Sequence, residues 1–196
     1  MTGYHGTTVL AVLGDGHLAI GGDGQVSTGE GTILKHGARK VRRLRGGKVL
    51  AGFAGAVADA ITLLEALEAK LEAYQGNVPR AAVELGRQWR TDRTLHRLEA
   101  QILVGDSRHL LVISGSGEVI EPDDGVAAVG SGGAYALAAA RALVRHGSMN
   151  PGAVVDAALR IAAEICVYTN DTITIEEVTA DDGVGAADAP PGGGGA

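Results

Sequence analysis

Short apolar runs separated by glycine-containing turns make up the first quarter of the chain. Runs of this kind, bounded by turn residues, predict β-strands. Strands are expected at 9–13, 18–21, 32–35, 40–44 and 48–54. Gly14-Asp15-Gly16 stands between the first two of them, which predicts a β-hairpin.

The spacing of apolar residues then changes to steps of three and four, which indicates one face of an α-helix. This face is formed by Val57, Ile61, Leu64, Leu67 and Leu71. A second helix is expected from Pro79 to about Asp92, because proline favours the first turn of a helix. The apolar face of this second helix is continued by Val83, Leu85 and Trp89.

Strand patterns return at 101–104, 110–114, 119–121 and 126–129. Two more helices are expected at 135–144 and from Pro151 to about Val167, and 172–178 alternates as a closing strand. Two helices between successive groups of strands disfavour parallel βαβ units and favour antiparallel sheets with helices on their outer faces. We therefore predict an α+β fold, a four-layer α–β–β–α sandwich.

The length of 196 residues suits one compact domain, expected at 7–178. Residues 1–6 are expected to be a short pro-segment, and 179–196, rich in Gly, Ala and Asp, a disordered tail. Hydrophobic residues make up 45% of the chain but aromatic residues only 3%, so Ala, Val, Leu and Ile must build the core.

Charge and cysteine content exclude several classes of protein. A net charge of −6 gives no indication of a nucleic-acid partner. Cys166 is the only cysteine, which rules out an internal disulfide and favours a reducing, cytoplasmic location. The apolar runs are too short to span a membrane, and the sequence does not begin with a signal-peptide pattern.

Thr7 and Thr8 are the first candidates for chemistry. A threonine hydroxyl becomes a nucleophile when a base lies beside it, and its own α-amino group can serve once the preceding peptide bond is cut. An α-amine has a pKa of about 7.7–8.0, so part of it is neutral near neutral pH. Taken alone, the pair is better explained as the start of a strand, which β-branched residues favour, and only the residues further along the chain reverse that preference.

An enzyme of this kind needs a cation that keeps the amine neutral, a carboxylate that orients the cation, and a backbone N–H directed at the oxyanion. Lys40, Asp23 and Gly52 are the candidates for these roles. Gly52 and Gly55 lie between a predicted strand and a predicted helix. Each residue also has a plainer interpretation, with Asp23 as a turn residue and Lys40 as a solvated strand end.

The chain resembles the HslV (ClpQ) family of bacterial proteasome-like peptidases, which belong to the N-terminal-nucleophile hydrolases. The resemblance rests on Thr7-Thr8, Gly22-Asp23-Gly24-Gln25, Lys40-Val41-Arg42-Arg43-Leu44, Ala51-Gly52-Phe53-Ala54-Gly55, Ala58-Asp59-Ala60, Trp89-Arg90-Thr91-Asp92-Arg93, Gly130-Ser131-Gly132-Gly133 and Tyr168-Thr169-Asn170. It implies a threonine endopeptidase with Thr7 as nucleophile, Asp23 and Lys40 as its supporting pair, and Gly52 as oxyanion donor. Ser131 would bond near the terminal amine, although a serine before a helix is also a common N-cap.

The resemblance further implies a sodium ion on the backbone carbonyls of Ala163, Cys166 and Thr169. A glycine stands in the family at the first of these positions, but a carbonyl ligand does not depend on the side chain. The implied assembly is a homo-oligomer of two stacked hexameric rings that degrades polypeptides together with the ATPase and unfoldase HslU. This chain itself has no Gly-x-x-x-x-Gly-Lys-Ser/Thr motif and is not expected to bind nucleotide.

Other interpretations are open at this stage. Gly21-Gly22-Asp23-Gly24 is similar to a calcium-binding repeat, but only one copy is present, and Gly130-Ser131-Gly132-Gly133 could bind a phosphate before a helix. The chain could instead be a true proteasome β-subunit, another amidohydrolase of the superfamily, or an unprocessed structural subunit. Ring symmetry and intact mass would distinguish these alternatives.

Overall fold

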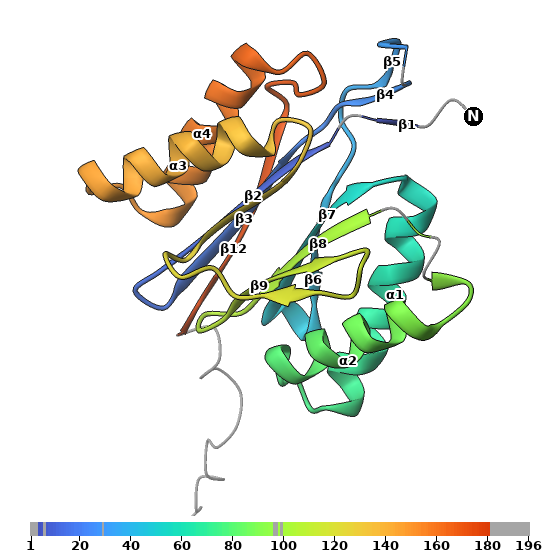
Figure 1. Ribbon diagram of the computed structural model, residues 1–196. Coiled ribbons are helices and arrows are strands. Elements are labelled where there is room, and N and C mark those ends of the chain that lie inside the picture. Colours follow the sequence, from blue (N-terminus) through green and yellow to red (C-terminus); the bar gives the residue numbers. More distant parts are fainter. Residues whose placement is uncertain (1–3, 6, 29, 96–97, 99, 181–196) are drawn as a thin grey trace, which may run out of the picture.

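Two antiparallel sheets pack face to face, and a pair of helices covers the outer face of each (Figure 1). This computed structural model describes residues 4–5, 7–28, 30–95, 98 and 100–180. One sheet has the strand order β11-β2-β3-β12 and lies under α3 and α4; the other has the order β10-β9-β8-β7-β6 and lies under α1 and α2. The predicted four-layer α–β–β–α sandwich is confirmed.

The four helices are α1 (Val57–Ala73), α2 (Val78–Thr91), α3 (Gly133–His146) and α4 (Pro151–Ile165). The strands of the two large sheets are β2 (Thr8–Gly14), β3 (His17–Asp23), β6 (Val41–Leu44), β7 (Val49–Gly55), β8 (Ala100–Gly105), β9 (Leu110–Ser114), β10 (Val119–Ile120), β11 (Val126–Gly130) and β12 (Ile173–Thr179). A third, small sheet joins β1 (Tyr4–His5), β4 (Val26–Thr28) and β5 (Ile33–Lys35).

The hairpin of β2 and β3 closes through Asp15 and Gly16, which both have positive φ, 51° and 74°. Two central residues with positive φ define the type I′ turn, whose twist matches that of the flanking strands. Gly14 pairs with His17 across this turn, as the sequence predicted for a two-residue loop.

Alternation along β2 divides its side chains between two cores. Val9 and Ala11 belong to the cluster between the two sheets, whereas Leu10 and Val12 belong to the cluster under α3 and α4. Because side chains on both faces of this strand are buried, a register slip of one residue would exchange the two sets. The register of β2 therefore fixes which side of the sheet each threonine at its start faces.

Helix starts follow the expected capping chemistry. Asn77 caps α2 by accepting the Arg80 N–H at 2.9 Å, and Asn150 caps α4 by accepting the Ala153 N–H at 2.8 Å. A proline follows each cap within the first turn, where its missing N–H costs no hydrogen bond.

Three expectations about the elements were wrong. Ile61 was assigned to the buried face of α1 but is 51% exposed, because Ala60 and Leu63 take that face instead. Val83 on α2 is 38% exposed for the same reason, since Ala81 and Ala82 pack inward. Strands β1 and β4 were not predicted, because their short, partly polar sequences carry no clear alternation.

The folded part also extends past the expected end of the domain at residue 178. Thr179, the last residue of β12, pairs with His17 of β3, and the Ala180 N–H donates to the Gly16 carbonyl at 3.1 Å. Most of the expected tail, 181–196, and most of the expected pro-segment lie outside the described residues. Among the residues that the structure describes, no helix has the length and apolar character that a membrane crossing requires.

Candidate functional site

The two adjacent threonines face opposite sides of their sheet. Thr8 is two residues from Leu10, so its side chain lies on the same side of the strand and faces α3 and α4. Thr7 is two residues from Val9, so by the same alternation its side chain faces the second sheet. The Thr7 carbonyl accepts the Ser131 N–H at 2.9 Å, which continues the pairing of β2 with β11. Thr7 is 8% exposed.

The Thr8 hydroxyl is committed to structural hydrogen bonds. It lies 2.6 Å from the Thr169 hydroxyl and accepts the Gly132 N–H at 2.9 Å, and Thr8 has no exposed surface. A hydroxyl held in this way cannot reach a substrate. Thr8 is therefore a structural residue, and Thr7 remains the candidate nucleophile of the pair.

Asp23 occupies the end of β3 as a fully buried carboxylate with four hydrogen-bond donors. Its Oδ1 accepts from the Thr8 N–H at 2.8 Å and from Lys40 Nζ at 2.7 Å. Its Oδ2 accepts from the backbone N–H groups of Gln25 at 2.9 Å and Asn170 at 3.2 Å. Asp23 thus links the start of β2 to the lysine and is more than a turn residue.

Lys40 is 3% exposed and precedes β6. Besides Asp23, its ammonium donates to the Gln25 carbonyl at 2.7 Å. Burial lowers the pKa of Lys40, and the charge and hydrogen bond of Asp23 oppose that shift. A Cβ at Gly22 would lie only 3.3 Å from the Lys40 Cβ, so the glycine leaves room for the lysine over β3. The alternative of a solvated strand end does not hold for Lys40.

Gly52 does not occupy the position that its expected role requires. It lies inside β7, opposite Val41 on one side and Leu103 on the other. The Phe53 N–H donates to the Lys40 carbonyl at 3.1 Å, and successive N–H groups alternate in direction, so the Gly52 N–H points into the ladder with β8. A Cβ at Gly52 would approach Val9 to 2.6 Å, which shows that this glycine allows the two sheets to pack closely.

Gly55 is the glycine at the junction of β7 and α1. It has a φ of 137°, a value that favours glycine, and Ala56 after it is the N-cap of α1. Its N–H shares the direction of the Phe53 N–H, toward β6, but β6 begins at Val41, opposite Gly52. Since no β6 residue lies opposite Gly55, its N–H is directed past the end of β6, on the side of Lys40.

Ser131 is exposed and lies in the turn between β11 and α3. The N-cap of α3 is Gly132, without a side-chain capping bond, so the alternative role of Ser131 as N-cap does not hold. The preceding Gly130 has a φ of 91°, and a Cβ there would collide with the Thr7 carbonyl oxygen. This turn therefore packs directly against the candidate nucleophile.

Comparisons with known proteins agree with this geometry. A family model described as proteasome subunit matches residues 4–178. The "ATP-dependent protease subunit HslV" of Geobacillus sp. (strain WCH70) is 58% identical over 180 residues, which cover 91% of this chain and 100% of that protein. This chain belongs to the HslV peptidases of the proteasome family. The HslV subunit of Desulfovibrio desulfuricans is 59% identical over 172 residues, 88% of this chain and 97% of the relative.

Solved structures extend the HslV assignment to the fold. The crystal structure of eukaryotic HslV from Trypanosoma brucei superposes with a TM-score of 0.84 at 43% identity, covering 88% of this chain and 99% of that one. Thiobacillus denitrificans BPH in complex with epoxomicin gives a TM-score of 0.67 at 22% identity, covering 88% and 98%, and is similar in fold alone.

The three expected sodium ligands lie together at the end of α4. Ala163 is in its last turn, Cys166 is its C-cap, and Thr169 closes the following turn by donating its N–H to the Cys166 carbonyl at 3.0 Å. Carbonyls in the last turn of a helix have no partners within the helix and carry the negative end of its dipole. A carbonyl has two lone pairs, so the one on Cys166 can accept a second interaction. Uncharged oxygen donors of this kind suit a hard monovalent cation.

In the described part of the chain, no group of three or more His, Cys, Asp or Glu side chains could hold a metal ion. This finding applies also to the single calcium-like repeat around Asp23, whose carboxylate is already saturated by N–H donors.

Asn170 supports the site and was missed as a functional residue. Its side-chain oxygen accepts the Gly24 N–H at 3.0 Å and its amide donates to the His36 carbonyl at 3.0 Å. Gln25 Nε2 also donates to the Val167 carbonyl at 2.9 Å, so the loop after α4 is bonded both to the segment after β3 and to the segment after β5. The polar run Tyr168-Thr169-Asn170 after an apolar helix was the available signal.

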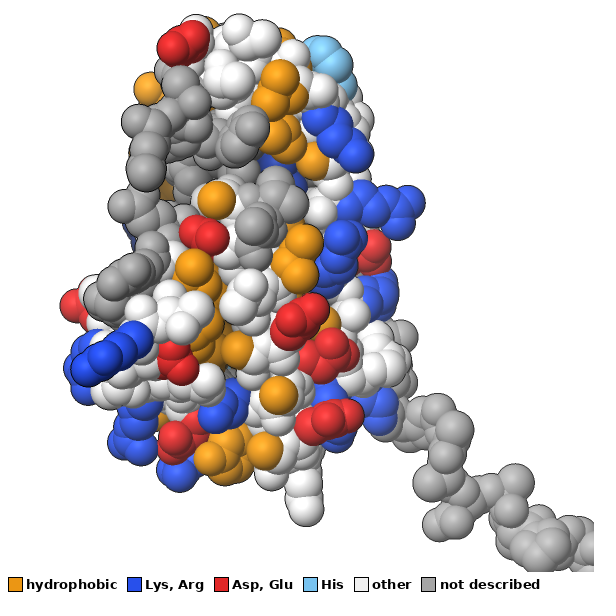
Figure 2. Space-filling view, turned by 90° about the vertical axis from the view of Figure 1, so that its right-hand side faces the viewer, with side chains coloured by type: hydrophobic (Ala, Val, Ile, Leu, Met, Phe, Trp, Pro, Cys, Tyr) orange, Lys and Arg blue, Asp and Glu red, His pale blue; other side chains and the backbone are white. Residues whose placement is uncertain are grey.

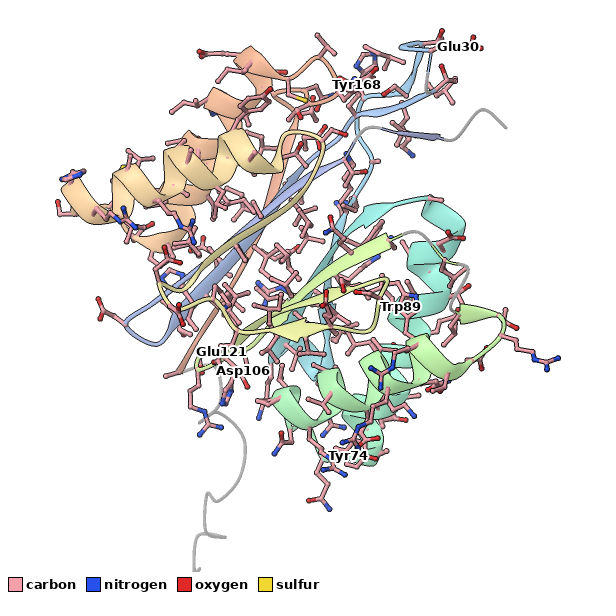
Figure 3. All side chains as sticks on the ribbon, viewed as in Figure 1. Glu30, Tyr74, Trp89, Asp106, Glu121 and Tyr168 are labelled. Carbon is pink, nitrogen blue, oxygen red and sulfur yellow. The ribbon has the colours of Figure 1, made fainter. Side chains whose placement is uncertain are left out.

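A cleft of about 510 Å³ opens beside this loop. It is lined by Ser131, Tyr135, Ile165, Cys166, Val167 and Tyr168. Figure 3 shows Tyr168 in the loop after α4, at the end of the sandwich where β4 and β5 lie. The cleft thus borders the same end of the molecule as Thr7, whose carbonyl binds Ser131.

Proposed function

We propose that this HslV-family chain is a threonine endopeptidase, the proteolytic subunit of a two-component ATP-dependent protease, with Thr7 as its nucleophile. The buried Lys40–Asp23 ion pair at the start of β2 is the observation that carries the proposal. Cleavage of the bond between Gly6 and Thr7 would free the Thr7 α-amine to act as base. The chain itself supplies the base, the cation and the orienting carboxylate within three neighbouring strand ends.

The two charged residues have separate tasks in this mechanism. The positive charge of Lys40 disfavours a second positive charge on the Thr7 amine, which keeps that amine able to accept the hydroxyl proton. Asp23 holds Lys40 in place through a 2.7 Å bond and orients the strand through the Thr8 N–H. The Thr7 hydroxyl then attacks the substrate carbonyl, the amine passes the proton to the leaving amine, and water hydrolyses the resulting ester.

The oxyanion of the tetrahedral intermediate needs a backbone N–H donor beside Thr7. We assign this role to Gly55 in place of Gly52. Its N–H points past the end of β6, whereas the Gly52 N–H is directed into the sheet. The Ser131 N–H is bonded to the Thr7 carbonyl and so helps to fix Thr7. We propose that the Ser131 hydroxyl bonds near the new amine, as the resemblance to the family implies.

A sodium ion on the carbonyls of Ala163, Cys166 and Thr169 belongs to the same proposal. When bound, it would hold the end of α4 and the following turn in one geometry. That turn carries Thr169, which binds Thr8, and Asn170, which binds Asp23. The contribution of the ion would therefore be to position the site.

The assembly and partner follow from the HslV family. We propose two stacked hexameric rings that enclose the active sites and an HslU-type ATPase that unfolds and delivers polypeptides. The absence of a nucleotide-binding motif from this sequence is consistent with ATP hydrolysis on a separate chain. The chain alone is expected to cleave flexible peptides slowly and folded proteins hardly at all.

Intact mass and peptide hydrolysis test the proposal together. The active protein should have lost residues 1–6 and begin at Thr7, and Thr7→Ala should abolish both processing and hydrolysis. Thr8→Ser, which keeps the buried hydroxyl, is the matched control and should retain both. An unprocessed chain that hydrolyses peptides, or an active chain beginning at Thr8, would overturn the assignment.

A further inference from the structure

The five-stranded sheet has two open edges that carry opposite charges. Its outermost strands are β6 and β10, and an open edge is where another chain can dock. Along the chain, the exposed charged residues of segment 39–48, which contains β6, are all basic: Arg39, Arg42, Arg43, Arg45 and Lys48. Those of segment 118–124, which contains β10, are all acidic: Glu118, Glu121, Asp123 and Asp124. Figure 2 shows Lys and Arg side chains gathered in a column along one margin of the face that it draws.

Several of these charges have no ion-pair partner within the described part of the chain. Arg43 binds Glu176 and Asp124 binds Arg141, which leaves both pairs locally neutral. The structure gives no ion pair to Arg39 or Arg42 on one edge, or to Glu118 or Glu121 on the other. We call the first two residues the basic edge and the last two the acidic edge.

The register of the sheet places the two edges in the same rows. Val104, Ala51 and Arg42 are paired in one row with Leu111, and continuing the β9–β10 ladder by one residue adds Glu121 to that row. Ser114 pairs with Gln101 and Gln101 with Ala54, and the Ser114 N–H donates to the Glu118 carbonyl at 3.0 Å. Continuing the β6–β7 ladder by two residues places Arg39 in this second row. Glu121 therefore shares a face of the sheet with Arg42, and Glu118 shares the opposite face with Arg39.

We infer that the basic edge of one copy of this chain binds the acidic edge of a second copy, head to tail. A copy displaced sideways across the sheet brings Glu118 to Arg39 and Glu121 to Arg42. Ile120, 56% exposed between the two acids, adds apolar surface to this contact. A contact between two different surfaces of the same chain generates rings when its rotation closes, which agrees with the proposed hexameric ring on which this inference rests.

The contact would also connect assembly to catalysis. Lys40 lies between the basic-edge residue Arg39 and the first residue of β6, Val41. A neighbour bound on both sides of Lys40 would hold the strand that presents the lysine to Asp23. Figure 3 shows Glu121 toward the opposite end of the sandwich from Tyr168.

Charge reversal tests this interface. Arg42→Glu and Glu121→Arg should each place like charges in contact and weaken ring formation about tenfold or more, measured by native mass spectrometry over a concentration series. The double variant Arg42→Glu/Glu121→Arg restores opposite charges at every contact and should recover the rings and most of the peptide hydrolysis. Lys70→Glu and Glu72→Arg on α1 are the matched controls and should leave assembly unchanged.

The outcomes separate this inference from the proposed function. Single reversals that assemble like the parent, or a double variant no better than either single one, would overturn the interface and leave the peptidase proposal standing. Intact rings of Thr7→Ala that still hydrolyse peptides would overturn Thr7 as the nucleophile and leave the interface standing. Loss of the rings in both single variants, together with their recovery in the double variant, supports the interface.

Discussion

Replacing Lys40 by alanine should separate catalysis from folding. Lys40 contacts Asp23 and the Gln25 carbonyl and belongs to neither large hydrophobic cluster that packs the sheets against the helices. Its loss leaves the Asp23 carboxylate buried without its cation, and breaking a buried ion pair costs about 3–5 kcal/mol. Asp23 keeps three backbone N–H donors, from Thr8, Gln25 and Asn170, so we expect a cost of about 3 kcal/mol.

A loss of this size lowers the melting temperature without unfolding the protein. For a domain of 150–250 residues, each kcal/mol corresponds to about 2–4 °C, which gives a decrease of about 6–12 °C. Domains are stable by about 5–15 kcal/mol, so Lys40→Ala should still fold and assemble. Peptide hydrolysis, in contrast, should fall by about 10²–10⁴-fold, the usual contribution of positioned acid–base groups.

The assay is hydrolysis of a short fluorogenic peptide by rings whose assembly and melting temperature are measured on the same sample. Lys40→Arg should also fail, because a planar guanidinium does not replace a compact ammonium in a buried site. Lys70→Ala on α1 is the matched control and should keep full activity. Near-normal hydrolysis by intact Lys40→Ala rings would refute the assignment and direct attention to Arg39 or Arg42.

The remaining predictions test other parts of the site. Burial lowers the pKa of Lys40 in the folded protein below its ordinary value of 10.5, so between these two pKa values the unfolded chain binds more protons than the folded one. The free energy of unfolding should therefore rise with pH across that window, whereas peptide hydrolysis should fall as the lysine loses its charge. Melting curves and pH–rate curves check the two signs. Thr8→Val should cost about 1–3 kcal/mol by leaving the Gly132 N–H and the Thr169 hydroxyl unpaired, measured by denaturant unfolding, whereas Thr8→Ser should cost less. Truncation after Ala180 should change neither assembly nor basal hydrolysis, and a truncated chain that stays monomeric would show contacts made by the tail. Adding an HslU-type ATPase with ATP should stimulate degradation of a casein-like substrate, whereas equal degradation of a folded substrate by the chain alone would contradict the gated two-component proposal.

The elements could be predicted from the sequence because their signals are local. Alternating apolar residues, the turn at Asp15 and Gly16, and the asparagine–proline starts of α2 and α4 each lie within a few residues of the element they determine. The buried face of α1 could not be predicted in full. Ile61 and Leu63 are both apolar, and only packing against β7 and α2 determines which of them is buried.

The site was predicted in part, because its contacts are distant in the sequence. Asn170 donates to Asp23 across 147 residues, and no local pattern connects the two. The choice between Gly52 and Gly55 depends on which neighbouring strand each N–H meets, and that follows from where β6 begins. Both glycines lie in one short stretch, so their roles separate only once the register of β6 and β7 is known.

The adjacent threonines have complementary roles that a strand imposes on any such pair. Side chains alternate across a strand, so one threonine faces the second sheet whenever the other faces the loop after α4. The Thr8 side chain binds that loop through Thr169, and its backbone N–H binds Asp23. Thr8 thereby fixes the strand from both sides, next to the proposed nucleophile Thr7. The second threonine is thus a support that the nucleophile needs, and moving the cleavage by one residue would remove that support together with the nucleophile.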